Sequence, residues 1–249
     1  IIAEAGVNHN GREELAFQLV DIAAAAGADA IKFQTFRAES LATRSARMAR
    51  YQIENIGIEE SQHDMLRKLE LSRAAHQRLI EYSAQKGILF LSSPFDEGSA
   101  DFLVKIGVPL LKIPSGEVTN IGFLEHLGAL GPPLILSTGM SDLEEVAGAV
   151  KALLSGAVVP DLVLLHCVSN YPARDEDCNL LAMHTLEKAF GLPVGFSDHT
   201  VGTEVAMAAV ALGAVVIEKN FTIDPALPGP DHKASLSPKE LASLVRGIR

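Results

Sequence analysis

The sequence lacks tryptophan, has only two cysteines and has few aromatic residues, and these absences exclude several classes of protein. Two cysteines are too few for the disulfide framework of a small secreted domain. Cys167 lies inside an apolar run and is predicted to be a buried thiol, so a cytoplasmic location is the simplest expectation. No apolar run reaches the length of a transmembrane helix, and no signal peptide is visible.

An excess of positive charge is also missing, because the formal net charge is -10. This charge argues against non-specific binding to nucleic acid or to an anionic membrane. It does not exclude a small anionic substrate, since a few lysines and backbone amides can bind one locally. The chain begins without methionine and ends in a helix-like pattern, so we expect that both ends are trimmed.

Short, nearly continuous apolar runs alternate with amphipathic stretches along all 249 residues. Strands that are buried on both faces have this character. The predicted strands are Ile1–Val7, Ala30–Phe36, Ile88–Phe95, Leu110–Gly116, Leu134–Met140, Leu162–Ser169, Val194–His199 and Val215–Phe221. Helical patterns, most followed by glycine, are predicted at Glu13–Ala26, Arg73–Lys86, Ser99–Ile106, Ser141–Leu154 and Thr203–Leu212. Ser72, Ser141 and Ser237 are the expected helix N-caps.

Eight strands that alternate with helices predict an α/β fold, a single (β/α)8 TIM barrel over residues 1–249. A doubly wound open sheet usually has fewer strands, and no GxGxxG turn is present. The segment Arg37–Ser72 is longer than an ordinary loop, so we expect a flap over the top of the barrel. Four histidines in the helical or flap segments, at positions 63, 76, 126 and 184, are expected to lie mostly on the surface.

Polar residues occur at nearly every predicted strand end, where the active site of such a barrel lies. They include Glu4, Lys32, Gln34, Ser93, Lys112, Ser115, Glu117, Ser137, Ser169, Tyr171, Ser197, His199, Glu218, Asn220 and Asp231. Ionisable groups inside a barrel are unfavourable unless they are paired or used in a site. The set therefore indicates a site, although a single residue such as Glu218 could serve only in a structural ion pair.

The residue types in this set suit a phosphorylated carboxylic acid. Lys32 and Lys112 supply point charge, and Ser93 and Ser115 supply directed hydrogen bonds for a phosphate and a carboxylate. Glu117 is a candidate acid or base. His199 is a candidate ligand for a divalent metal that would polarise a carbonyl group.

Six segments resemble the sialic acid synthase family, in the order that the family has them. They are residues 2–11 (IAEAGVNHNG), 28–35 (ADAIKFQT), 112–117 (KIPSGE), 136–140 (LSTGM), 195–200 (GFSDHT) and 228–233 (PGPDHK). The resemblance implies a barrel that condenses phosphoenolpyruvate with N-acetylmannosamine or a related amino sugar, giving a nine-carbon sugar acid and phosphate. Legionaminic and pseudaminic acid synthases and spore-coat polysaccharide proteins are variants of the same family.

The resemblance also implies roles for individual residues. Lys32, Ser93, Lys112, Ser115, Ser169 and Ser197 match the positions that bind phosphoenolpyruvate. Gln34, Glu117, Tyr171 and Asp231 match positions that face the sugar, and we place Glu4 with them. His199 and Asn220 match the two ligands of a manganese or magnesium ion. The expected catalytic residues are Lys32, Lys112, Glu117 and His199, and a homodimer is expected.

Two features depart from the family. The strand-eight motif normally reads Glu-Lys-His-Phe-Thr, whereas residues 218–222 read EKNFT, so Asn220 replaces the second histidine ligand. An amide oxygen can bind magnesium or manganese, which leaves the metal affinity and the activity open. The small C-terminal antifreeze-like domain of the family is expected to be absent from this chain.

Two alternatives remain open at this point. One is a Schiff-base aldolase on the same fold, with Lys112 or Lys219 as the nucleophile. The other is a non-catalytic paralogue that binds a sugar phosphate and whose metal site has been degraded by Asn220.

Overall fold

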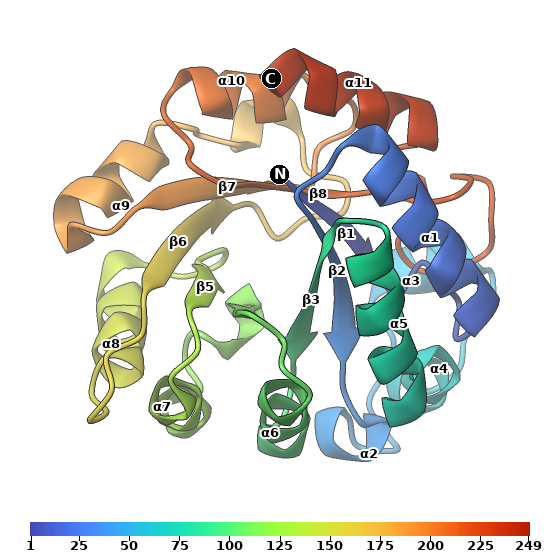
Figure 1. Ribbon diagram of the computed structural model, residues 1–249, viewed down its shortest axis with the longest axis horizontal. Helices are drawn as coiled ribbons and strands as arrows, with labels where there is room; N and C mark the ends of the chain where they lie inside the picture. Colours follow the sequence, from blue (N-terminus) through green and yellow to red (C-terminus); the bar gives the residue numbers. More distant parts are fainter.

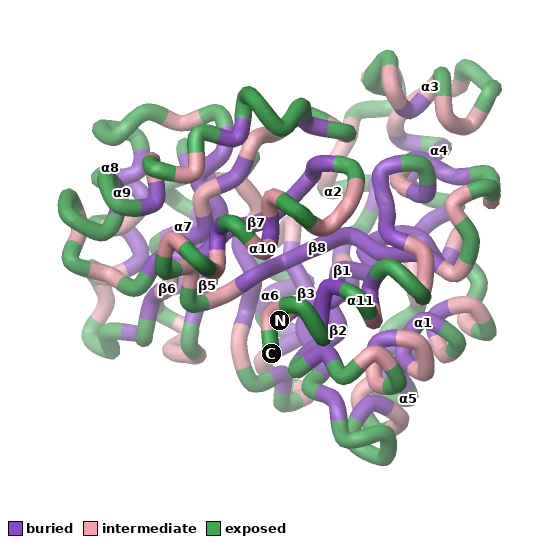
Figure 2. The backbone as a smooth tube through the Cα atoms, turned by 90° about the horizontal axis from the view of Figure 1, so that it is seen from above, coloured by how far each residue is buried: buried purple, intermediate pink, exposed green.

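The computed structural model describes residues 1–249, and its eight parallel strands close into a barrel. The strands, which pair in chain order, are β1 (Ile2–Gly6), β2 (Ala30–Thr35), β3 (Leu89–Pro94), β4 (Leu111–Ile113), β5 (Leu134–Ser137), β6 (Leu162–Cys167), β7 (Val194–Asp198) and β8 (Ile217–Asn220). Helices surround this ring (Figure 1), and exposure increases from the strands outward (Figure 2). The predicted (β/α)8 barrel is confirmed, and every predicted strand is present with shorter ends.

The outer helices follow the strands in the expected alternation. They are α1 (Glu13–Ala26), α5 (Arg73–Gln85), α6 (Glu97–Lys105), α7 (Ile121–Leu130), α8 (Leu143–Leu153), α9 (Ala182–Phe190), α10 (Glu204–Ala211) and α11 (Pro238–Ile248). The sequence patterns did not single out α7 and α9. No helix of the structure is long and apolar enough to cross a bilayer.

The start of α8 differs from the prediction because an aspartate follows the predicted capping serine. The side chain of Asp142, and not that of Ser141, accepts hydrogen bonds from the backbone N–H groups of Glu144 and Glu145. Ser141 instead donates to the carbonyl of Gly139. A carboxylate at this position also interacts favourably with the positive end of the helix dipole. Ser72 and Ser237 cap their helices as predicted.

Two of the four histidines expected near the surface are buried, which corrects that expectation. His63 is buried in α4 (Gln62–Leu69), and His76 is buried in α5. The ring of His76 lies between Thr35 Oγ1 at 2.8 Å and the carbonyl oxygen of Ser72 at 3.0 Å. Both ring nitrogens are therefore partnered, which allows a histidine to lie on the buried face of an amphipathic helix.

The barrel interior consists of an apolar layer with a polar layer above it. The apolar layer contains Ile2, Ala30, Leu91, Ile135 and Leu165. Two residues further along each of these strands, the side chains are Glu4, Lys32, Ser93, Ser137 and Cys167. Because side chains on a strand return to the same face every second residue, these five also point into the barrel. Along each of these strands, the inward-facing side chain thus changes from apolar in the core to polar in the site within two residues.

The segment between β2 and α5 forms the predicted flap. Its three short helices are α2 (Ala38–Leu41), α3 (Arg50–Ile56) and α4. Flap residues Met48, Met65 and Leu66 pack in one apolar cluster with Val7 and Phe36, which directly follow β1 and β2. This cluster holds the flap against the carboxyl ends of the strands.

Leu165 tests the importance of the apolar layer, because it is fully buried inside the barrel. We expect Leu165→Ala to lower the free energy of unfolding by about 2–5 kcal/mol through the cavity that it leaves. Leu181→Ala is the matched control, because Leu181 is 62% exposed. Urea unfolding of the two variants measures the difference, and equal stabilities would contradict this description of the core.

Candidate active site

The carboxyl ends of the strands surround a cavity of about 530 Å³ that the flap covers on one side. Of the residues predicted to form the site, it is lined by Glu4, Lys32, Gln34, Ser93, Lys112, Ser115, Ser169, Tyr171, Ser197, His199, Asn220 and Asp231. The closure of the barrel therefore brings together residues from seven strands or the loops that follow them. Flap residues Leu41, Tyr51, Gln52, Gln62, Met65 and Leu66 complete the wall.

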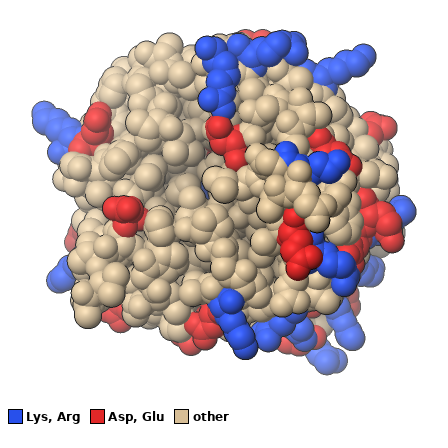
Figure 3. All heavy atoms as spheres, in the orientation of Figure 1, with Lys and Arg blue, Asp and Glu red and all other residues tan.

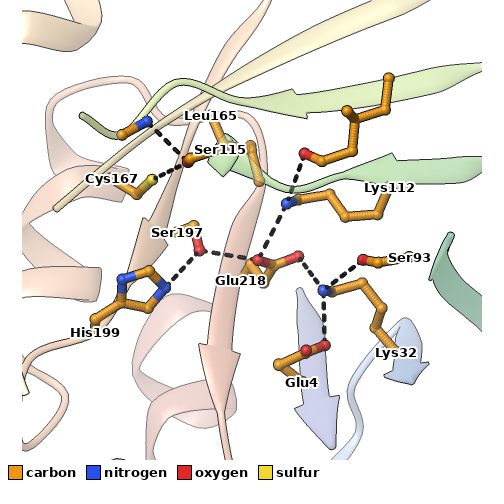
Figure 4. A network of polar contacts seen from close by, with 12 residues as sticks. Glu4, Lys32, Ser93, Lys112, Ser115, Leu165, Cys167, Ser197, His199 and Glu218 are labelled. Atoms are coloured by element: carbon orange, nitrogen blue, oxygen red, sulfur yellow. Dashed lines mark hydrogen bonds and ion pairs between the residues drawn. The ribbon is translucent and has the colours of Figure 1, made fainter. Parts of the chain in front are cut away.

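Glu218 lies at the centre of a buried charge network on the cavity floor (Figure 4). Its carboxylate oxygens lie 3.5 Å from Lys32 Nζ and 3.6 Å from Lys112 Nζ. Ser197 Oγ donates to Glu218 Oε1 at 2.9 Å. Glu4 Oε2 lies 2.9 Å from Lys32 Nζ on the other side. Two carboxylates and two ammonium groups thus alternate within a few ångströms.

This arrangement fixes which groups are charged. Burial alone would raise the pKa of Glu218, but Lys112 and Lys32 lower it below the ordinary value. Burial alone would lower the pKa of Lys32, but Glu218 and Glu4 raise it. Burial raises the pKa of Glu4 against the effect of Lys32. Burial lowers the pKa of Lys112, which Glu218 offsets only in part. Glu218 and Lys32 are therefore ionised at neutral pH.

The two lysines differ in how fully the protein satisfies them. Lys32 has Glu4 at 2.9 Å and also donates to Ser93 Oγ at 3.1 Å. Lys112 has only longer contacts, 3.3 Å to the carbonyl oxygen of Ile113 and 3.6 Å to Glu218. An ammonium group has three donors, so Lys112 retains capacity for a ligand. A bound anion would find two positive charges at one end of the cavity.

Hydroxyl groups gather beside the lysines around Gly139. The backbone N–H of Gly139 donates to Ser115 Oγ at 2.9 Å, and Ser115 Oγ lies 3.2 Å from Cys167 Sγ. A Cβ atom at position 139 would collide with Ser169 Oγ and Cys167 Sγ, so glycine leaves this space open. Ser137 Oγ is buried, lines the cavity and has no partner in the protein. A buried hydroxyl without a partner is a candidate ligand contact.

The imidazole of His199 is held in one orientation by its neighbours. Nδ1 donates to the carbonyl oxygen of Val168 at 2.6 Å, so in the neutral ring Nε2 is the acceptor. Tyr171 stacks on this ring with a centroid separation of 4.1 Å, and its hydroxyl donates to Nε2 at 3.1 Å. Burial lowers the pKa of His199 and favours the neutral ring. The lone pair of Nε2 is therefore occupied by the Tyr171 hydroxyl, which would have to turn away for a cation to bind this nitrogen.

Asn220 ends β8, whose register with β7 pairs Asp198 with Lys219, the residues that directly precede His199 and Asn220. It lines the cavity, and its carboxamide makes no hydrogen bond within the protein. The structure has no group of three or more His, Cys, Asp or Glu side chains that could hold a metal. An imidazole nitrogen and an amide oxygen still fit magnesium or manganese, which can retain water or substrate ligands. The donor set thus fits a hard divalent cation that has few ligands from the protein.

The opposite side of the cavity is less charged. Its flap wall is formed by apolar and amide side chains, including Met65, Leu66 and Gln62, and Gln62 Oε1 is buried without a partner. Asp231 provides the carboxylate of this side, and burial raises its pKa to about 6. Tyr51 of the flap stacks on Tyr171 with a centroid separation of 6.0 Å. This side suits a neutral polar molecule that has some apolar groups.

Two residues considered from the sequence lie outside the cavity wall. Glu117 lies in a 3-10 turn after β4, where its carboxylate accepts a hydrogen bond from Asn120 at 2.8 Å. Lys219 faces away from the cavity and forms a fully buried ion pair with Asp198 at 2.9 Å. The structure gives Lys219 no access to a substrate in this cavity, so it is not a candidate nucleophile.

Two residues of the site received no role from the sequence. Glu218 precedes Asn220 by two positions on the same strand, so the two-residue period of β8 could have predicted that both face the cavity. Ser137 ends β5 inside the barrel, and the same period relates it to the buried Ile135. The alternation of side chains along a strand was therefore enough to predict that Glu218 and Ser137 face the cavity.

Figure 3 shows one face of the molecule, on which acidic and basic side chains are interspersed around the edge. Lys and Arg form no continuous basic surface on that face. The charges that could bind an anion are instead buried in the cavity.

The chain is similar along its whole length to several named synthases. It is 53% identical to N,N'-diacetyllegionaminic acid synthase of Legionella pneumophila, covering 100% of this chain and 71% of that one. It is 37% identical to human N-acetylneuraminate-9-phosphate synthase, covering 100% of this chain and 69% of that one.

A solved structure and a family model also match this chain. The crystal structure of N-acetylneuraminic acid (sialic acid) synthetase from Leptospira borgpetersenii in complex with citrate superposes with a TM-score of 0.87. It is 38% identical, and the match covers 99% of this chain and 81% of that one. The model of the NeuB family matches residues 19–249. The chain therefore belongs to the NeuB family.

Proposed function

We propose that this protein is an enzyme that condenses phosphoenolpyruvate with an amino-sugar aldehyde, giving a nonulosonic acid and phosphate. The observation that supports this most directly is the pair of buried lysines held by Glu218 at one end of a cavity in the barrel mouth. The similarity to an N,N'-diacetyllegionaminic acid synthase and to an N-acetylneuraminate-9-phosphate synthase supports the same reaction class.

Phosphoenolpyruvate would occupy the charged end of the cavity. Lys32 and Lys112 would bind its phosphate and carboxylate groups by fixed positive charge. The hydroxyls of Ser93, Ser115 and Ser137 would donate directed hydrogen bonds, and we assign Ser169 and Ser197 to the same subsite. The other face of the enol would then be open toward the flap.

The sugar would occupy the flap side of the cavity. Gln34, Tyr171 and Asp231 would hydrogen-bond its hydroxyl and amide groups, and Glu4 would contribute from the floor. The flap wall has no cation, so we propose a neutral amino sugar and not a phosphate ester. Glu117 does not line the cavity, so its proposed sugar contact would require the turn after β4 to move inward.

The proposed reaction forms one carbon–carbon bond and replaces the C2–O bond to phosphate with a C2–O bond to the oxygen of water. The two protons of that water end on the former aldehyde oxygen and on the released phosphate. C3 of phosphoenolpyruvate attacks the aldehyde carbon, and the aldehyde oxygen takes up a proton. Water adds to C2, and the resulting tetrahedral intermediate expels phosphate to leave a ketone. Lys32 and Lys112 stabilise the anionic groups throughout, and Glu218 keeps both ammonium groups in place.

We propose that a magnesium or manganese ion binds His199 Nε2 and Asn220, and that it would polarise the aldehyde when bound. Tyr171 orients the His199 ring by stacking, and the carbonyl of Val168 fixes its tautomer. A cytoplasmic location, which rests on the low cysteine content, and a homodimer, which rests on the family alone, complete the proposal.

The test of the function is release of phosphate from phosphoenolpyruvate with a panel of amino sugars that includes N-acetylmannosamine. We expect the wild-type chain to form phosphate and a sugar acid in equal amounts. Lys112→Ala should lower kcat/KM for phosphoenolpyruvate at least about 100-fold, because it removes a preorganised charge. Lys105→Ala, an exposed lysine on α6, should stay within about twofold of wild type.

A fully active Lys112→Ala variant would contradict the proposed phosphoenolpyruvate site. Trapping of the substrate by borohydride on Lys112 would instead support the Schiff-base aldolase. Binding of phosphoenolpyruvate without turnover of any sugar would support a non-catalytic binding protein.

Metal binding can be measured apart from activity, by the loss of the free Mn²⁺ signal in electron paramagnetic resonance. We expect Asn220→His to tighten Mn²⁺ binding, because imidazole is a stronger donor than an amide oxygen. Asn220→Ala should weaken it, and exposed Asn179→Ala should leave it unchanged. Equal affinities in all four proteins would rule out Asn220 as a ligand.

A further inference from the structure

Asn10, in the turn after β1, does not line the cavity, yet it contacts a loop more than 200 residues later in the chain. Asn10 Nδ2 donates to the carbonyl of Pro228 at 2.8 Å, with a sequence separation of 218 residues. Asn10 Oδ1 lies 3.1 Å from Nε2 of His232. The amide of Asn10 thus connects to the loop at two points on either side of Asp231.

The hydrogen-bond roles in this contact determine one another. The carbonyl of Pro228 can only accept, so the Asn10 amide must donate there and turn its oxygen toward His232. Nε2 of His232 must then be the protonated nitrogen, and Nδ1 accepts from Thr222 Oγ1 at 2.6 Å. Burial lowers the pKa of His232 to about 4, which agrees with a neutral ring that has one N–H.

The close approach depends on two unusual backbone positions. Asn10 has φ 51, in the left-handed region that asparagine tolerates better than most residues. A Cβ atom at Gly229 would lie 2.6 Å from Asn10 Oδ1 and 2.5 Å from His232 Cδ2, so only glycine fits. The conformation of Asn10 and the absence of a side chain at Gly229 therefore both allow the turn and the loop to come into contact.

The backbone at Asp231 is fixed by a second asparagine. The backbone carbonyl of Asp231 accepts a hydrogen bond from Ser235 Oγ at 2.6 Å, and Ser235 Oγ in turn accepts one from Asn8 Nδ2 at 2.9 Å. Asn8 is fully buried and also donates to the carbonyl of Phe221 at the end of β8. The carboxylate of Asp231 itself lines the cavity and has no hydrogen-bond partner in the protein. The hydrogen bonds to the loop backbone therefore determine where the Asp231 side chain enters the cavity.

We propose that Asn10 is a positioning residue for the sugar subsite, because it fixes the loop of residues 228–233 so that Asp231 points into the cavity. This inference rests on the proposed function in assigning Asp231 to the sugar.

The flap rests on the same loop and links it further to the sugar side. Asn55 Nδ2 donates to the carbonyl of Pro230 at 2.6 Å, and Lys233 Nζ donates to the carbonyl of Glu54 at 3.2 Å. Lys32 and Lys112 lie on β2 and β4 and make no hydrogen bond to the loop. Displacement of the loop should thus disturb the sugar and not phosphoenolpyruvate.

The test uses Asn10→Gly, because glycine keeps the left-handed backbone and removes only the amide. We expect the KM for the amino sugar to rise about tenfold or more, with the KM for phosphoenolpyruvate within about twofold of wild type. In an Asp231→Ala background the same change should raise the KM for the sugar less than about threefold, because Asn10 acts through Asp231. Asn179→Gly is the matched control, since Asn179 is exposed with φ 40, and it should leave both KM values unchanged.

An unchanged KM for the sugar in Asn10→Gly would overturn the proposal, and so would an equal rise in both KM values. Equal effects of Asn10→Gly with and without Asp231 would also overturn it. If the wild-type chain releases no phosphate with any sugar, the proposed function fails. Hydrogen exchange of the backbone amides then tests the positioning role separately. The proposal predicts at least tenfold faster exchange of residues 228–234 in Asn10→Gly than in wild type, and unchanged exchange would overturn it.

Discussion

The rest of the site depends on the carboxylate of Glu218, which lies between the ammonium groups of Lys32 and Lys112. Two buried ammonium groups on either side of one carboxylate would repel each other, and burial would favour their neutral forms, if that carboxylate were absent. The carboxylate raises the pKa of Lys32 and offsets in part the lowering of the pKa of Lys112 by burial, so it favours the charged form of both lysines. A phosphorylated carboxylic acid then meets positive groups that are already in place, which is the condition for electrostatic preorganisation.

The barrel makes this arrangement possible through its register. Lys32 is the partner of Glu4 across β1 and β2, and Ser197 is the partner of Glu218 across β7 and β8. Residues that are far apart in the sequence thus reach the same level of the barrel, one step of the pleat above the apolar layer. Loss of packing in that layer would move all of them, so stability and site geometry are linked.

The sequence predicted the barrel and the flap, because buried strands follow a local period. Twelve of the thirteen residues that it predicted for the site line the cavity, and Glu117 does not. The sequence-based predictions were wrong where the position of a side chain depends on contacts in the folded structure. Nothing local distinguishes Ser141 from Asp142 as the cap of α8, or shows that Glu117 turns toward Asn120. The role of Asn10 depends on a contact across 218 residues, which no local pattern contains.

The central claim is that phosphoenolpyruvate binds to the two lysines on either side of Glu218. A crystal structure of the protein with phosphoenolpyruvate bound tests it most directly. The account predicts that the phosphate and carboxylate oxygens lie within hydrogen-bonding distance of Lys32 Nζ and Lys112 Nζ. Phosphoenolpyruvate bound elsewhere, with the Glu218 network unchanged and without contact to either lysine, would contradict it.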